Sequence, residues 1–163
     1  MIITYNQVRA YAVQILGSLT DSELILLLNS LINIIKFEPF FDNALTRFLL
    51  RRSICNPEKV GHAFYWLLKS DLLANPSLHR FEIILKYLLT SIGPYKNLLL
   101  QQEKFLNDLE DVVTSVNEPS DNSITQRTAT MREKLVEIAI PYALSLPINS
   151  DIKISRILVN KCQ

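Results

Sequence analysis

Residues 48–72 read FLLRRSICNPEKVGHAFYWLLKSDL, and this stretch decides the fold. It predicts two amphipathic helices joined by a turn so short that they must pack together. In the first helix, Leu45, Phe48 and Leu49 recur at the spacing that places side chains on one face. The second helix carries two apolar stripes, which are Val60, Ala63, Phe64, Leu67 and Leu68 on one side and His62, Trp66 and Leu73 on the other. A helix that is apolar on two sides is normally covered on both, so we expect Trp66 to be buried.

The turn between these helices carries a helix-start signal. Asn56 suits the N-cap, and Pro57 suits the first helical position because proline lacks the donor that would be unsatisfied there. Glu58 then favours the positive end of the helix. This signal is structural and contains no reactive chemistry.

The rest of the chain also reads as helices. The first is expected at about residues 6–17. The second runs from Asp21 to about Lys36, after a capping box of Thr20 and Glu23 with Leu19 and Leu24 as a hydrophobic staple, and Phe37-Glu38-Pro39 ends it. Asn75-Pro76 predicts another helix start, and Gly93-Pro94 predicts a helix end followed by a new start.

Two further helices complete the predicted set. A long one should follow Pro94, with Tyr95, Leu98, Leu99, Gln102, Phe105, Leu109, Val113 and Val116 on one face. The polar segment 117–123 predicts a surface loop. The last helix should start near Ser123, align Ile124, Met131, Leu135, Ile138 and Tyr142, and kink or end at Pro141.

Helix starts near residues 6, 21, 43, 57, 76 and 94 pair into units of the size of HEAT-type repeats. The predicted fold is therefore all-α, a HEAT- or armadillo-like α-solenoid of about seven helices. The end of the chain differs, because Ile152–Ser155 alternates and Ile157–Val159 is β-branched and apolar, which indicates a short strand-like tail. No other segment has strand patterning, so we expect the tail to fray and its deletion to change the melting temperature little.

Composition excludes several functions. The chain has 163 residues, 48% hydrophobic and 20% charged, with a formal net charge of +1, which argues against nucleic acid as the main partner. The apolar run Leu24–Ile35 is too short and too polar to span a bilayer, and no signal peptide is visible. Cys55 and Cys162 have no pairing or metal-type spacing. We expect both thiols to be reduced, in a cytoplasmic setting.

Several residues are candidate site residues, and a structural role is favoured for each. His62 could act as a base for Cys55, but no third orienting group has a recognisable spacing. Gly61 inside a helix indicates the close approach of a neighbouring helix. Arg52 should bridge helices by pairing with a carboxylate such as Glu58 or Asp71, and Arg51-Arg52 could otherwise form an anion site.

The central stretch resembles the helical accessory (PIK) domain of phosphoinositide 3-kinases. The residues that carry the resemblance are Phe48–Leu50, Arg51, Arg52, Asn56, Gly61, His62, Tyr65, Trp66, Leu68 and Lys69, with Val8–Val13 and Lys36–Pro39 upstream. The match covers about residues 7–115 well. Phe37–Phe40 and Gly61-His62 look like class I enzymes, whereas Tyr65–Lys69 also looks like class II.

This resemblance implies a scaffold. Residues 1–145 would be the helical domain, lacking its first helices, and residues 146–163 would be a linker and first strand leading into an absent kinase domain. Kinase, lipid-binding and Ras-binding domains and a regulatory subunit would pack on it. The parent protein would use ATP and magnesium to phosphorylate the inositol 3-hydroxyl at membranes. Arg51, Arg52, Asn56, Gly61, His62 and Trp66 would be structural scaffold residues.

The chain itself carries none of the motifs of a lipid kinase. The phosphate-covering loop, the catalytic Asp with its Asn, and the metal-binding Asp-Phe-Gly are missing, so no catalytic, cofactor or metal site is expected here. The alternative function is a free-standing α-solenoid adaptor for protein–protein interaction. Whether the reading frame continues past Gln163 into a kinase domain would separate the two.

Overall fold

The computed structural model describes residues 2–75, 77–117 and 124–159. Over these ranges it contains seven α-helices, one π-helical turn and two strands. The elements are α1 (Ile2–Leu16), α2 (Asp21–Lys36), α3 (Ala44–Cys55), η1 (Pro57–Gly61), α4 (His62–Ala74), α5 (His79–Ser91), α6 (Tyr95–Asn117), α7 (Ile124–Glu137), β1 (Ser145–Leu146) and β2 (Asn149–Lys153). The predicted all-α class is confirmed. The chain forms two compact units, residues 1–96 and 97–163.

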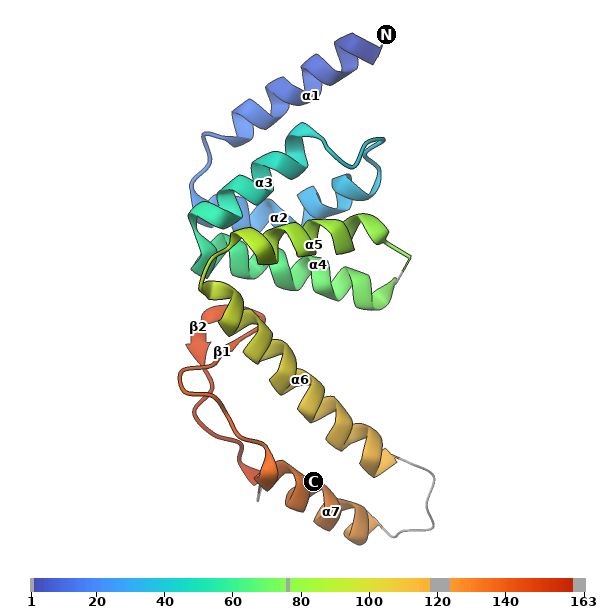
Figure 1. Ribbon diagram of the computed structural model, residues 1–163, viewed down its shortest axis with the longest axis vertical. Coiled ribbons are helices and arrows are strands. Elements are labelled where there is room, and N and C mark those ends of the chain that lie inside the picture. Colours follow the sequence, from blue (N-terminus) through green and yellow to red (C-terminus); the bar gives the residue numbers. More distant parts are fainter. Residues whose placement is uncertain (1, 76, 118–123, 160–163) are drawn as a thin grey trace. The chain divides into compact units, whose positions relative to one another are not determined.

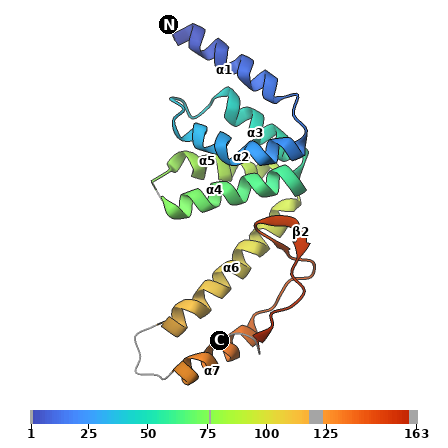
Figure 2. The same cartoon turned by 180° about the vertical axis from the view of Figure 1, so that it is seen from behind.

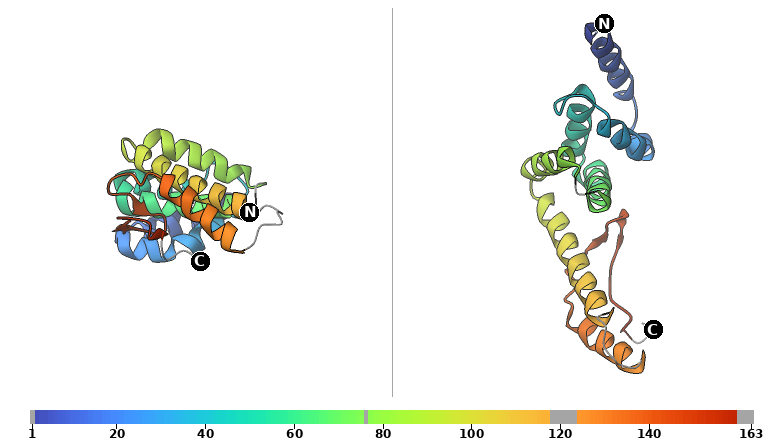
Figure 3. Two further views of the ribbon diagram at one scale, coloured as in Figure 1. Left: turned by 90° about the horizontal axis from the view of Figure 1, so that it is seen from below. Right: turned by 90° about the vertical axis from the view of Figure 1, so that its right-hand side faces the viewer.

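The helices of the first unit form two layers. α2 packs against α4 in one layer, while α1 and α5 pack on opposite sides of α3 in the other (Figure 1). Figure 2 shows the molecule from the side of the α2–α4 layer, and the right-hand view of Figure 3 shows the two layers edge-on, one beside the other. Contacts within the α2–α3 and α4–α5 pairs close each hairpin. Hairpins stacked in this way are the arrangement of an α-solenoid.

The core of this unit lies between the layers. Its fully buried side chains include Leu28, Ile32, Leu49, Phe64 and Leu88. The buried residues of α2 and α5 recur at spacings of three and four, so each of these helices presents one continuous apolar face. Because complete burial of such a side chain is worth about 1.5–3 kcal/mol, these faces hold the hairpins together.

Helix ends in the first unit follow the capping signals with one exception. Thr20 Oγ1 accepts from the Glu23 amide at 3.3 Å, and Glu23 Oε2 accepts from the Thr20 amide at 2.8 Å, so the predicted capping box is present. The hydrogen bonds from Thr20 lower the pKa of Glu23. α2 ends before Phe37-Glu38-Pro39 as predicted. Gly93 takes the left-handed conformation, with φ of 68°, that its place after a helix requires.

The exception is the start of the fifth helix, which was predicted at Asn75-Pro76. α5 begins instead at His79. The Asn75 amide donates to Asp71 O at 3.0 Å and thereby ends α4, and Asn75 Oδ1 accepts from the Ser77 amide at 3.2 Å. Asn75 therefore closes a local turn rather than capping a helix.

In the second unit, the tail finds a partner that sequence patterning did not indicate. β1 and β2 pair antiparallel, with Ser145 opposite Lys153 and Leu146 opposite Asn149, and the Ile154 amide donates to Leu144 O at 2.7 Å. The expectation of an unpartnered strand is therefore wrong. Residues 157–158 form no strand either. The expected domain boundary between residues 145 and 146 falls inside β1 and stays a prediction.

A buried amide ties this hairpin to α6. Gln102 is 1% exposed, and its Nε2 donates to Ser145 O at 2.7 Å and to Ser145 Oγ at 2.8 Å. Figure 1 shows the strands beside the first part of α6. Leu144 is fully buried whereas Tyr142 is 99% exposed, so the core does not end at Tyr142 as expected. A two-residue strand alone offers no alternation to read, which is why the pairing was missed.

The other predictions for this unit hold in part. α6 buries Leu99, Gln102 and Phe105 as expected, but Val112 is buried in place of Val113. α7 ends at Glu137, before Pro141, and buries only Leu135 among its described side chains. The loop was expected at residues 117–123, but Asn117 is the last residue of α6. Residues 118–123 and Cys162 lie outside the described residues. No helix in the described ranges is long and apolar enough to cross a membrane.

Replacing Gln102 with Ala should loosen the β1–β2 hairpin. The change leaves two buried Ser145 oxygens without their donor, which should cost about 1–3 kcal/mol. Hydrogen exchange of the β2 amides, followed by mass spectrometry, would report the faster opening. Gln101→Ala, at the exposed neighbouring position, is the matched control, and equal exchange in the two variants would contradict a role for the Gln102 amide.

Candidate functional site

One polar cluster of the first unit joins three chain segments at Asp21. Arg52 donates to Asp21 Oδ1 through Nε at 3.0 Å and Nη2 at 2.5 Å. Asn56 Nδ2 donates to Asp21 Oδ2 at 2.8 Å, and Arg52 Nη2 also reaches Leu19 O at 2.9 Å. We call Asp21, Arg52, Asn56, Gly61 and His62 the hairpin junction. It brings together the start of α2, the end of α3 and the start of η1.

Local sequence explains why these three side chains meet. Asp21 opens α2 and Arg52 lies in the last turn of α3, so each has the charge that its helix end favours. Asn56 uses both ends of its amide, because its Oδ1 accepts from the Lys59 amide at 3.3 Å while its Nδ2 serves Asp21. Hydrogen bonds from Asn56 and Arg52 lower the pKa of Asp21, and the bond from Asn56 has the larger effect.

The prediction for Arg52 was right in kind and wrong in partner. It bridges helices through a carboxylate, but the carboxylate is Asp21 rather than Glu58 or Asp71. Asp71 instead pairs with Lys36 at 2.9 Å. Arg51, the neighbouring residue, is exposed and takes no part in the junction.

Gly61 lies where the packing leaves no room for a side chain. A Cβ built there would be 2.8 Å from Ser53 O and 2.8 Å from Ile92 Cδ1. The close approach expected at this position is therefore present, between the end of α3 and the residue that follows α5. The Gly61 amide donates to Asn56 O at 2.9 Å, which is the widened spacing of a π-helical turn. Sequence patterning did not predict this turn.

His62 is 2% exposed and its Nδ1 lies 3.0 Å from Tyr95 Oη. The two rings meet edge to face, with centroids 6.2 Å apart. Cys55, by contrast, is exposed at the end of α3. A buried imidazole that is hydrogen-bonded to a tyrosine supports the structural interpretation of His62 rather than a pair with Cys55.

Trp66 is only partly buried, contrary to expectation. The aromatic residue that enters the core is its neighbour Tyr65, which is 1% exposed and meets the Trp66 ring edge to face at 5.3 Å. Leu73, farther along the same predicted stripe, is 74% exposed. The second apolar stripe of α4 is therefore buried at His62 and becomes exposed toward the helix end.

Sequence reasoning missed a second polar cluster, around the loop after α2. Glu38 is 8% exposed and pairs with Arg9 of α1. Arg80 of α5 donates to Glu38 O at 2.5 Å and to Phe40 O at 2.8 Å, and its guanidinium lies 4.9 Å from the Phe41 ring centroid. The sequence indicates a helix end at Phe37-Glu38-Pro39, which is also part of the family resemblance, and it predicts no partner for Glu38. The sequence does carry a signal for a buried ion pair here, because Glu38 lies among the apolar residues Phe37, Pro39, Phe40 and Phe41.

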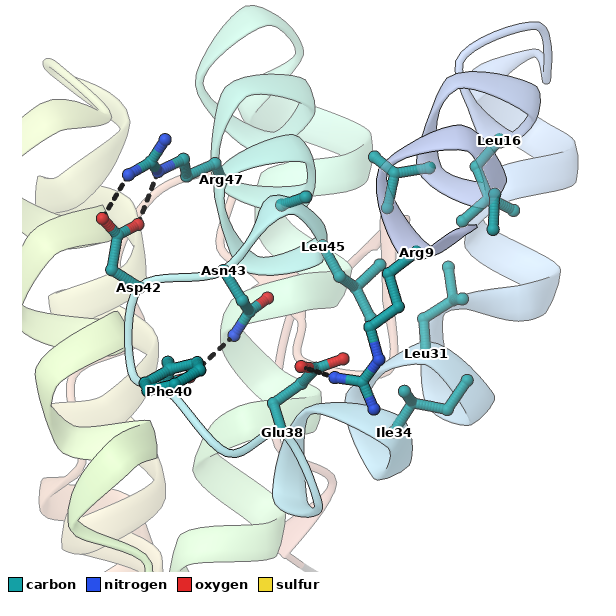
Figure 4. Close-up of a pocket in the computed structure, with 13 residues that line it drawn as sticks. Arg9, Leu16, Leu31, Ile34, Glu38, Phe40, Asp42, Asn43, Leu45 and Arg47 are labelled. Atoms are coloured by element: carbon teal, nitrogen blue, oxygen red, sulfur yellow. Dashed lines mark hydrogen bonds and ion pairs between the residues drawn. The ribbon is translucent and has the colours of Figure 1, made fainter. Parts of the chain in front are cut away.

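A pocket of about 380 Å³ lies beside this cluster, between α1, α2 and the start of α3. Figure 4 shows the Arg9–Glu38 pair crossing it, with Leu16, Leu31 and Leu45 around it. Its walls are mainly aliphatic. Across the described ranges, no three His, Cys, Asp or Glu side chains are grouped so that they could hold a metal ion.

Comparison with known proteins gives one consistent result. A family model described as "Phosphoinositide 3-kinase family, accessory domain (PIK domain)" matches residues 3–101. The chain is 34% identical over 156 residues to phosphatidylinositol 3-kinase 1 of Dictyostelium discoideum, covering 96% of this chain and 10% of the relative.

Two further relatives match at similar coverage. Phosphatidylinositol 3-kinase 2 of the same organism is 29% identical over 158 residues, covering 97% of this chain and 8% of the relative. The human phosphatidylinositol 4-phosphate 3-kinase C2 domain-containing subunit beta is 31% identical over 162 residues, covering 96% and 10%. The chain therefore spans a tenth or less of the length of these relatives.

Asp21→Asn should destabilise the first unit in a pH-dependent way. The folded-state pKa of Asp21 lies below its value in the unfolded chain, about 3.9. Its interactions therefore stabilise the fold above that pH and are lost as the pH falls through the folded-state pKa. Allowing for solvent screening, we expect about 1 kcal/mol at pH 7, measured by urea unfolding.

Asp42→Asn is the matched control for this experiment. Asp42 also pairs with an arginine, Arg47, but both side chains are largely exposed, so the loss at pH 7 should be smaller than for Asp21→Asn. A stability difference between wild type and Asp21→Asn that is the same at pH 3 and pH 7 would contradict the assigned role of the carboxylate.

Gly61→Ala should destabilise the first unit although alanine is the better helix former. The clash with Ser53 O and Ile92 Cδ1 should cost about 1–3 kcal/mol. Alanine gains about 1 kcal/mol in helix propensity over glycine, so most of the range of the clash energy exceeds this gain. Thermal unfolding measures the balance. Ile92→Val removes one of the two clashing atoms, so it should lower the stability less in the Gly61→Ala background than in the wild type. If the stability losses of the two substitutions simply add, the close approach at Gly61 is contradicted.

Proposed function

Because the chain belongs to the accessory-domain (PIK domain) family of phosphoinositide 3-kinases, we propose that it is the helical scaffold of a larger phosphatidylinositol 3-kinase. Its role is to hold other domains in place rather than to react. Kinase and lipid-binding domains of the parent polypeptide, and a regulatory subunit, would pack on its helices. The parent would transfer a phosphoryl group from ATP, with magnesium, to the inositol 3-hydroxyl of a membrane phosphoinositide.

The hairpin junction is the observation that carries this proposal. A scaffold must resist bending between successive hairpins, since its value lies in fixed geometry. Arg52 and Asn56 attach the end of one hairpin to Asp21 at its beginning, and Gly61 lets η1 approach Ser53 closely. Directional hydrogen bonds beside a tight contact fix the angle between elements more strictly than apolar packing alone.

Exposed apolar side chains on α1 suggest what packs against this helix in the parent. Val8, Tyr11 and Ile15 form an apolar row along α1 and are 62%, 65% and 55% exposed. We propose that earlier helices of the domain cover this row, and that residues 146–163 lead toward the first strand of the kinase domain. In this arrangement residues 1–145 are the scaffold part.

The proposal can be tested on the native polypeptide. Antibodies against residues 1–163 should purify a protein several times longer than 163 residues. With ATP and magnesium, that protein should convert phosphatidylinositol in vesicles to its 3-phosphate, whereas the isolated 163-residue chain should not. A native polypeptide that lacks a kinase domain, or turnover by the isolated chain above a mock preparation, would contradict the proposal and favour the adaptor or an enzyme in its own right.

The scaffold role needs a separate measurement. Arg52→Met in the full polypeptide should lower the melting temperature and the lipid kinase activity together, because the end of α3 is no longer held to the start of α2. Lys86→Met, at an exposed position on α5, should change neither. Loss of activity in the Arg52→Met protein with an unchanged melting temperature would instead assign Arg52 a direct role in the reaction.

A further inference from the structure

A second surface of the first unit shares no residue with the hairpin junction. A groove of about 670 Å³ runs between α3 and α5 on the layer facing the viewer in Figure 1. Leu50 and Ile54 of α3 and Ile83 and Tyr87 of α5 line it, with Phe41 at one end. We call this surface the α3–α5 groove.

The groove is apolar and open to solvent. Phe41, Ile83 and Tyr87 are 55%, 55% and 56% exposed. Large apolar side chains that gather at one surface, rather than being scattered, mark a binding site in soluble proteins. Because these three are more than half exposed, the groove is shallow. It therefore suits a helix lying along it better than a small molecule, which needs a pocket that buries most of its surface.

The dimensions of the groove match those of a helix. Leu50 and Ile54 are spaced four residues apart on α3, as are Ile83 and Tyr87 on α5, so each wall offers one row of side chains. α3 has 12 residues and is therefore about 18 Å long. A helix of three to four turns has this length, and its apolar face would fit between the two rows.

The edge of the groove carries one uncompensated positive charge. Asp42 and Arg47 line the groove and form an ion pair with each other. Arg51, one turn beyond Arg47, is exposed and has neither a hydrogen bond nor an ion pair with any residue that the structure describes. A carboxylate beside the apolar face of the bound helix would complement it.

We infer that the α3–α5 groove binds an amphipathic helix of a partner protein, with aliphatic side chains on its apolar face and carboxylates along one edge of that face. The carboxylates lie against Arg51, and the aliphatic side chains contact Ile83 and Tyr87. This inference goes beyond the scaffold role, because it assigns a partner chemistry to a surface that the junction does not use.

The test uses the 163-residue chain and a fluorescein-labelled helical peptide of about 15 residues, with leucines on one face and glutamates along one edge of that face. Fluorescence anisotropy should give a micromolar Kd that weakens as salt is raised. Arg51→Glu should weaken binding about fivefold or more, and Ile83→Asp more than about tenfold. The same peptide with lysines in place of the glutamates should bind more weakly.

Lys86→Glu is the matched control, because it makes the same charge change at an exposed position of α5 that does not line the groove. It should leave Kd within about twofold. If Ile83→Asp fails to fold by circular dichroism, Tyr87→Ser replaces it. The inference is overturned if the peptide does not bind, if Lys86→Glu weakens binding as much as Arg51→Glu, or if anionic vesicles bind in an Arg51-dependent way and the peptide does not. None of these results depends on lipid kinase activity, so the scaffold proposal is tested separately.

Discussion

The first unit depends on one carboxylate that serves three chain segments. Asp21 begins α2, yet the groups that surround it come from the end of α3 and from the turn before α4. Helix ends leave backbone groups without partners and carry partial charges. Asp21 and Arg52 place opposite charges at two of these helix ends, and Asn56 caps the next one by accepting from the Lys59 amide. The cluster therefore adds directional hydrogen bonds to the apolar core that holds the two hairpins together.

Arg51 and Arg52 illustrate how one helix separates two tasks. Consecutive residues on an α-helix do not face the same way. Arg52 reaches Asp21 and the Leu19 carbonyl, while Arg51 remains exposed at the edge of the α3–α5 groove. The sequence favours an interhelix bridge for Arg52 and leaves an anion site formed by both arginines as the alternative. The structure instead uses one guanidinium internally and leaves the other available to a partner.

Elements with strong local signals could be predicted from the sequence, and contacts between distant residues could not. The capping box at Thr20, the cap at Asn56 and the left-handed Gly93 each rest on a few neighbouring residues. Asp21 was recognised only as part of a helix start, because its partners lie 31 and 35 positions away. The exposure of Trp66 depends on where neighbouring helices end. The β1–β2 pairing depends on a strand of two residues, too short to show any periodicity.

The π-helical turn η1 has a consequence for how the chain length can vary. Val60, Gly61 and His62 are all buried, although three consecutive residues of an α-helix would spread over more than half of its circumference. The π-helical turn holds one residue more than an α-helical turn, so each residue rotates through a smaller angle about the helix axis. Val60, Gly61 and His62 can therefore all face the core. A relative with one residue fewer between Asn56 and His62 could close the same turn as ordinary α-helix, with Phe64 and Leu68 still facing inward. An alignment gap at this point would therefore record a change of helix type rather than a shift of the hairpin.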